Sequence, residues 1–127
     1  MAIIPKIREL DTFLQEHQEY KNVICESHPE LCFAMLNGEV LRSKKKDFIG
    51  FHERTKILSR YLGRKNIEGI WDYATTLKCN TDDVVDAVCL AVTASMKANG
   101  EFETIPNKPR KDSRGLLMQM IVPKIKN

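Results

Sequence analysis

Long apolar runs are absent from this sequence. No stretch approaches the roughly 18 uninterrupted apolar residues that a membrane-spanning helix needs. The opening residues Met1-Ala2-Ile3-Ile4-Pro5 also lack the basic start and long apolar core of a signal peptide. These absences argue against a transmembrane or secreted protein and predict a cytoplasmic one.

The spacing of the cysteines does not suggest a metal site. None of the four cysteines forms a C-x-x-C pair: Cys25, Cys32, Cys79 and Cys89. Three of them fall in apolar segments, as small buried residues do in a reducing compartment, so we expect neither a disulfide nor a zinc site. The sequence also has no P-loop, G-x-G-x-x-G, G-x-S-x-G or H-E-x-x-H signature.

The bulk composition is that of an ordinary globular protein. The chain has 127 residues, of which 43% are hydrophobic and 29% are charged, and its formal net charge is +3. This length predicts a single domain over residues 1–127. A mildly basic charge is compatible with an anionic partner but does not require one.

The clearest element is a helix from Thr81 to Asn99. Thr81 is a good N-cap, acidic residues follow it at the positive end of the helix dipole, and Gly100 is a stop signal. The body of the segment is apolar on two sides, and one side is a strip of alanines that would let a sheet approach closely. We therefore expect a buried helix around which the other elements pack.

Two acids of this helix are candidate metal ligands. Asp83 and Asp86 are three residues apart, so both carboxylates leave one side of the first turn. Asp86 lies among valines, where a carboxylate is partly desolvated unless something such as a divalent cation binds it. The alternative, which we favour on spacing alone, is a pair of solvated acids on an exposed turn.

Seven further segments have clear patterns. Helical spacing of apolar residues predicts four other helices, over residues 5–18, 29–36, 50–62 and 66–78. In the third of these, Glu53 and Arg54 are expected to point outward. A β-branched run predicts a buried strand over residues 22–26, and residues 116–122 predict a last strand. Residues 101–114, with two prolines, are expected to form a mobile loop.

Polar residues at two points of the chain suggest a site. Glu26 ends the predicted strand at a strand-to-helix junction, where α/β folds tend to place their sites, although an acid in a loop beside a helix is also common. His28 is more often a hydrogen-bonding loop residue than a ligand. The run 44–46 is Lys-Lys-Lys, which is usually a solvated loop but would contact phosphates if it lay near the acids.

Four blocks, in this order and spacing, resemble a known family. They are Pro5-Lys6-Ile7-Arg8-Glu9 followed by Asp11, then Glu26-x-His28-Pro29-Glu30-x-x-Phe33-x-x-Leu36-Asn37-Gly38, then Lys45-Lys46-x-x-x-Gly50-x-x-x-Arg54, and finally Asp83-x-x-Asp86-Ala87. Together they are similar to the DUF429 family of uncharacterised proteins, which are predicted nucleases of the ribonuclease H-like fold. The match extends over nearly the whole chain.

The resemblance implies a catalytic site that binds Mg²⁺ or Mn²⁺ through acidic residues. Carried over by position, its catalytic and metal-binding residues are Glu26 at the end of a strand and Asp83 and Asp86 on the last helix. The cations would clamp the attacking and leaving oxygens of a phosphodiester displacement in nucleic acid. The basic residues of the same blocks would contact the substrate: His28, Lys45, Lys46 and Arg54.

The chain departs from the family in one respect. The amino-terminal half of the fold, with its first three strands and the first-strand Asp, has no counterpart here. We therefore expect a partial ribonuclease H-like α/β fold of two or three strands and about five helices, completed by a second copy or by a complementing chain. Two functions follow as hypotheses: a metal-dependent nuclease or part of one, and a catalytically inactive, self-associating module derived from that scaffold.

Overall fold

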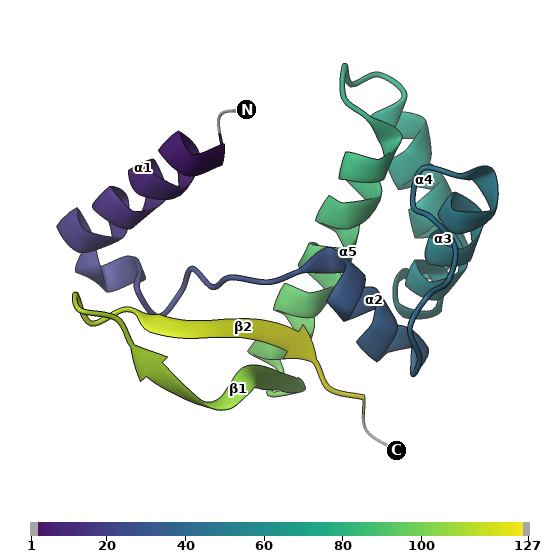
Figure 1. The fold of residues 1–127 in the computed structure, drawn as a ribbon. Helices are drawn as coiled ribbons and strands as arrows, with labels where there is room; N and C mark the ends of the chain where they lie inside the picture. The colour runs from purple at the N-terminus through teal and green to yellow at the C-terminus, as the bar shows by residue number, and fades with distance from the viewer. Residues whose placement is uncertain (1–2, 126–127) are drawn as a thin grey trace. The chain divides into compact units, whose positions relative to one another are not determined.

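The computed structural model describes residues 3–125 and has a mixed α/β architecture, as predicted (Figure 1). Five α-helices, one short 3₁₀ helix and a two-stranded antiparallel sheet make up its described part. In chain order they are α1 (Ile3–Glu16), η1 (Gln18–Tyr20), α2 (Pro29–Asn37), α3 (Phe48–Leu62), α4 (Arg64–Ala74), α5 (Thr81–Ala98), β1 (Phe102–Lys111) and β2 (Leu117–Pro123). None of these helices is long and apolar enough to cross a membrane.

The chain divides into two compact units. Within the described residues, the first unit comprises 3–26 and 104–120, and the second comprises 27–103 and 121–125. The assignment of residues 1–127 to a single domain stays a prediction.

The hydrophobic core lies in the second unit, and α5 is at its centre. Helix α5 packs against α2 and α3, and α3 packs against α4. The core residues of α5 recur at helical spacing along one face: Val85, Cys89, Val92 and Met96. The predicted role of this helix as the main packing element is therefore confirmed.

The alanine strip of α5 differs from the prediction. Ala87, Ala91, Ala94 and Ala98 are all exposed, so the helix buries one side and not two. The N-cap is Asn80 instead of Thr81, and its side chain makes no capping hydrogen bond. The apolar content of the segment correctly predicted a buried side, but the alanine side is not the one that is buried. Exposing an alanine methyl group to water costs little free energy, because its apolar area is small.

Local signals set the ends of α2 and α3 as predicted. Pro29 occupies the first turn of α2, and Gly38 ends that helix in the left-handed conformation with φ 85°. Helix α3 ends at Gly63, where φ is 81°. Glycine adopts such positive φ values without the steric cost that a Cβ brings, which is why these two positions stop their helices.

The segment predicted as a buried strand at 22–26 is not one. Val23 is 70% exposed and Ile24 is 38% exposed. Their backbone N–H groups both donate to the carbonyl of Tyr20, which continues the turn begun by η1. Only Glu26 makes a sheet contact, an isolated parallel bridge to Met120. Local hydrogen bonds thus outcompeted the β propensity of this run.

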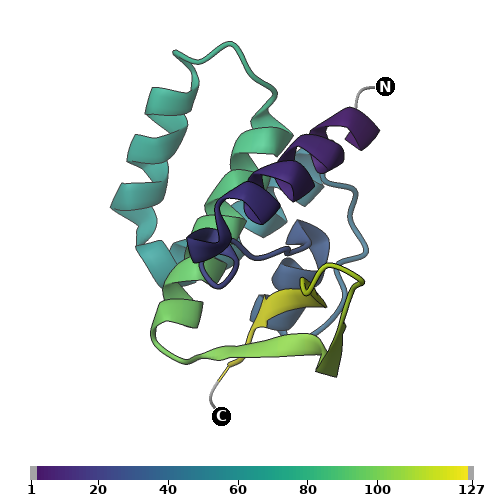
Figure 2. The same ribbon diagram turned by 90° about the vertical axis from the view of Figure 1, so that its left-hand side faces the viewer.

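The segment predicted as a mobile loop at 101–114 is mostly strand β1. It pairs with β2 in a hairpin, which confirms the last predicted strand (Figure 2). Pro106 and Pro109 lie within β1. A two-stranded sheet has only edge strands, and an edge strand tolerates proline because one side of it needs no backbone donors.

Candidate functional site

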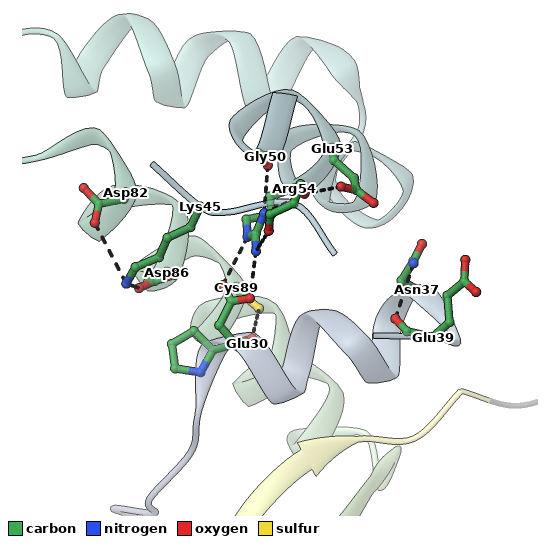
Figure 3. Close-up of polar contacts among 12 residues, drawn as sticks. Glu30, Asn37, Glu39, Lys45, Gly50, Glu53, Arg54, Asp82, Asp86 and Cys89 are labelled. Carbon is green, nitrogen blue, oxygen red and sulfur yellow. Dashed lines mark hydrogen bonds and ion pairs between the residues drawn. The ribbon is translucent and has the colours of Figure 1, made fainter. Parts of the chain in front are cut away.

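Lys45 and two acids of α5 meet in the second unit. The Lys45 Nζ lies 3.1 Å from Asp86 Oδ2 and 3.9 Å from Asp82 Oδ2 (Figure 3). Asp82 and Asp86 are four residues apart, so both side chains leave the same side of the helix. The hydrogen bond from Lys45 to Asp86 and the charges of Asp86, Asp82 and Glu30 raise the pKa of Lys45. Lys45 is therefore firmly cationic.

One oxygen of Asp86 is left without a partner. The Asp86 side chain is 20% exposed, and its Oδ1 is buried and accepts no hydrogen bond from any of residues 3–125. A buried carboxylate oxygen without a donor or cation is costly, because it has lost water without replacement. Asp86 consequently has spare capacity to bind a further donor or cation.

A pocket of about 550 Å³ opens beside this ion cluster. The loop before α3 and the start of α5 line it, through Lys45, Lys46, Asp47, Phe48, Phe51, Asn80, Thr81 and Asp82. Its lining combines two lysines with the amino-terminal ends of two helices, α3 and α5, where backbone N–H groups favour anions. The acids Asp47 and Asp82 counter part of that positive potential.

Arg54 holds the lysine loop in place. Its guanidinium donates to both carboxylate oxygens of Glu30, with Nη2 to Oε2 at 2.7 Å and Nε to Oε1 at 3.1 Å. It also donates to the carbonyl of Ser43 at 3.0 Å and to the Ser43 hydroxyl at 3.3 Å. Arg54 is 1% exposed, so the prediction that it points outward is wrong. A substrate contact by Arg54 stays a prediction.

Gly50 completes this arrangement. The carbonyl of Lys44 packs against Gly50, where a Cβ would overlap it, and the Gly50 carbonyl accepts a hydrogen bond of 3.1 Å from Arg54. The hydroxyl of Ser43 donates to Glu53. The spacing Lys45-Lys46-x-x-x-Gly50-x-x-x-Arg54 thus describes a loop fastened to the first two turns of α3.

Two thiols lie in the core next to the cluster. Cys32 on α2 and Cys89 on α5 are both fully buried. The Cys89 thiol donates to the Pro29 carbonyl at 3.7 Å. Interaction between the two thiols lowers the pKa of Cys32 to about 6 and raises that of Cys89, which burial and the charges of Asp86 and Glu30 raise further. Cys25 and Cys79 are exposed, so the expectation of burial fails for Cys25.

The structure brings together some of the predicted site residues. Lys45 and Lys46 line the same pocket, and Lys45 contacts Asp86. The Lys-Lys-Lys run therefore lies near the acids, which is the condition under which the sequence predicted phosphate contacts. Asp83 lies on the same turn of α5 as Asp86 and is exposed. His28 is the exposed N-cap of α2 and makes no side-chain capping bond.

Glu26 belongs to the first unit, whereas Asp83 and Asp86 belong to the second. Among residues 3–125, no three His, Cys, Asp or Glu side chains gather closely enough to hold a metal ion by themselves. A metal site formed by Glu26, Asp83 and Asp86 therefore stays a prediction.

Sequence reasoning missed Glu30 and Asp82. Glu30, a first-turn acid of α2, pairs with Arg54 from a position 24 residues away. Asp82 is one of the acids at the positive end of the α5 dipole, and its four-residue spacing to Asp86 is also the geometry that directs two side chains to one partner. That spacing was a signal within the sequence, whereas the pairing of Glu30 with Arg54 needs tertiary structure.

Comparison with known proteins identifies one family. The model of the family described as "Protein of unknown function (DUF429)" matches residues 1–111. No curated protein and no solved structure matches the chain. The ribonuclease H-like topology implied by the resemblance therefore stays a prediction.

Proposed function

Because the chain belongs to the DUF429 family, whose description assigns no function, we propose a function from the site itself: phosphodiester hydrolysis in nucleic acid, dependent on Mg²⁺ or Mn²⁺. One observation carries the proposal. The lysines that suit phosphate groups and the carboxylates that suit a divalent cation share one pocket and one ion cluster. A phosphodiesterase needs both kinds of group within reach of one phosphate.

The residues present fit a hard divalent cation. Asp82 and Asp86 supply carboxylate oxygens, and Asp86 Oδ1 has no other partner. Two protein carboxylates suffice for Mg²⁺, which commonly completes its coordination with water and substrate phosphate. When bound, such a cation stabilises the charge that develops on the attacking and leaving oxygens.

The protein's own side chains have two tasks in this proposal. Lys45 and Lys46 hold the phosphate, and Lys45 exchanges its present partners for the substrate when a cation neutralises Asp82 and Asp86. Arg54 and Glu30 keep the lysine loop at the start of α5. We place the activity in the cytoplasm, because exposed thiols such as Cys25 and Cys79 persist best in a reducing compartment.

Metal binding is tested by thermal unfolding. At a Mg²⁺ or Mn²⁺ concentration ten times the dissociation constant, binding adds about 1.4 kcal/mol to the free energy of unfolding. That corresponds to a rise in melting temperature of roughly 3–6 °C for a chain of this size. Asp86→Asn should abolish the rise, and Asp82→Asn should reduce it. Circular dichroism in chelated buffer and in millimolar metal measures both.

The matched control is Asp72→Asn, an exposed acid on α4 with no part in the cluster, which should keep the full rise. Lys45→Gln should enlarge the rise, because it removes the ammonium that competes with the metal for Asp86. The same measurement on Asp83→Asn and Glu26→Gln decides whether these two residues are ligands. A wild-type protein that shows neither a metal-dependent shift nor cleavage of labelled DNA or RNA in Mn²⁺ would contradict the proposal.

A second candidate function is self-association without catalysis, and the first unit favours it. Four large apolar residues of α1 are exposed, Ile4 by 65%, Ile7 by 60%, Leu10 by 47% and Phe13 by 38%. Leu14 is the one buried hydrophobic residue among those described in this unit. An apolar face of this size on an amphipathic helix is typical of a protein interface.

The charges of α1 favour a second copy as the partner. Lys6, Arg8 and Glu9 give the first half of the helix a net charge of +1, whereas Asp11 and Glu16 give the second half a net charge of −2. An antiparallel pairing of two α1 helices about a two-fold axis sets the basic half of each against the acidic half of the other. We therefore propose α1 as the dimerisation helix of this second function.

Light scattering tests this pairing. Wild-type protein should have twice the monomer mass of 14.6 kDa, and Leu10→Glu should convert it to monomer because a carboxylate would be buried in the apolar interface. Val40→Glu is the control, since Val40 is 77% exposed and lies in the other unit. A monomeric wild type would rule the second function out, and a dimer that cleaves nucleic acid would leave the first one in place.

A further inference from the structure

The segment 104–120 of the β1–β2 hairpin is positively charged. It contains four cationic side chains and one acidic one, a net charge of +3. The acid of β1, Glu103, lies 3.9 Å from Lys124. The cations are Lys108, Arg110, Lys111 and Arg114. A short segment with this excess of one charge sign favours an anionic partner.

The cationic side chains of the hairpin are free to meet a partner. Lys108, Arg110 and Lys111 are exposed, and none of them forms an ion pair with another residue of the described chain. Lys108 and Arg110 are two residues apart on β1, so they lie on one face of the strand at a spacing of roughly 7 Å. Arg114 makes one exposed contact, 3.5 Å from Asp11.

The single acid of the segment is used by the turn. Asp112 Oδ1 accepts the backbone N–H of Arg114 at 2.8 Å and that of Leu116 at 2.9 Å. The backbone N–H of Gly115 donates to the Asp112 carbonyl, and Gly115 has a φ of 85°. These bonds fix the turn and direct the carboxylate toward backbone donors. The acid therefore shapes the hairpin instead of neutralising a neighbouring lysine.

We propose that this hairpin binds the phosphate backbone of duplex nucleic acid, without reading its sequence. The segment 104–120 has no aromatic residue, so it lacks the stacking platform that single-strand binders use. A row of cations on a two-stranded ribbon instead suits a regular array of phosphates, and a β-ribbon fits the major groove of a duplex. The inference deepens the proposed function by naming a contact for its substrate, and it rests on that function for the choice of polymer.

The test is the salt dependence of binding in the presence of a chelator, so that it does not depend on the metal site. Fluorescence anisotropy with a labelled 20-base-pair DNA duplex, and with the RNA duplex of the same sequence, follows binding between 50 and 200 mM KCl. Three phosphate contacts should weaken wild-type binding about 40-fold over this range, because each contributes about −0.9 to the logarithmic salt slope. The triple variant K108Q/R110Q/K111Q should bind at least tenfold more weakly at 50 mM KCl and lose roughly 2.7 from its slope.

The matched control is K56Q/K65Q/K78Q, which removes the same charge from three exposed lysines of the second unit. It should keep the wild-type slope. Equal losses in the two triple variants would overturn the proposal, since net charge alone would then explain the binding. The proposal would also be overturned if the hairpin variant bound duplex as well as wild type does. Binding of the wild-type protein to anionic lipid vesicles but to neither the DNA nor the RNA duplex would overturn it as well. If the protein bound duplex in chelator but its melting temperature did not rise with metal, the hairpin proposal would stand and the proposed metal site would be rejected.

Discussion

Replacing Arg54 with methionine should lower the free energy of unfolding by about 3–5 kcal/mol. The guanidinium is 1% exposed and donates to Glu30, to Ser43 and to the carbonyl of Gly50, so its removal leaves several acceptors in or near the core without a donor. Trp71 is the single tryptophan and packs against the core of the same unit. Urea unfolding followed by its fluorescence measures the loss.

Two further variants make this result specific. Arg64→Met removes an exposed ion pair, Arg64 with Glu68 at 2.9 Å, and should change the free energy of unfolding by less than about 0.5 kcal/mol. Arg54→Lys should recover little, because an ammonium cannot reproduce the two parallel bonds to Glu30. If Arg54→Met lowered the free energy of unfolding no more than Arg64→Met, the contacts of Arg54 with Glu30, Ser43 and Gly50 would not stabilise the fold.

Phe33→Ala should be similarly destabilising, by about 3–5 kcal/mol. Phe33 lies on α2, is fully buried in the core and has the guanidinium of Arg54 at 5.8 Å from its ring centroid. Truncation removes the buried ring, leaves a cavity and takes away this cation–π contact. The same urea titration applies.

Phe48→Ala is its control. Phe48 is 83% exposed at the start of α3, so its truncation should change the free energy of unfolding by no more than about 0.5 kcal/mol. Equal effects of the two truncations would show that the second unit does not have the core described above.

Helix positions were predictable because their signals are local. Pro29 and Gly38 mark the ends of α2, Gly63 marks the end of α3, and apolar spacing marks the faces between. These signals act within one or two turns of chain, so no knowledge of distant segments is needed. The five predicted helices accordingly correspond to five observed ones in the described residues.

Strand positions were less predictable because a strand depends on its partner. Val23 and Ile24 have high β propensity, yet their N–H groups are used by a local turn. Conversely, Pro106 and Pro109 indicated a loop, yet their segment pairs with β2 as an edge strand. Both outcomes depend on which backbone donors find a partner, and an isolated segment does not contain that information.

The candidate site was predictable in part. The sequence identified Lys45 and Asp86, and the condition that the lysine run must lie near the acids is met. It placed Arg54 on the outside, because helical spacing does not reveal whether a charged residue has a buried partner. Glu30 provides that partner from another helix.

The attachment of the lysine loop also bears on what ligand binding would cost. Residues 43–46 form no helix or strand, but Ser43 is bonded to Arg54 and the Lys44 carbonyl rests on Gly50 and accepts the N–H of Asp47 at 3.1 Å. Ordering one residue of a free loop costs about 1–2 kcal/mol of conformational entropy. Here the chain meets that cost when it folds. A phosphate group would therefore meet a preorganised loop.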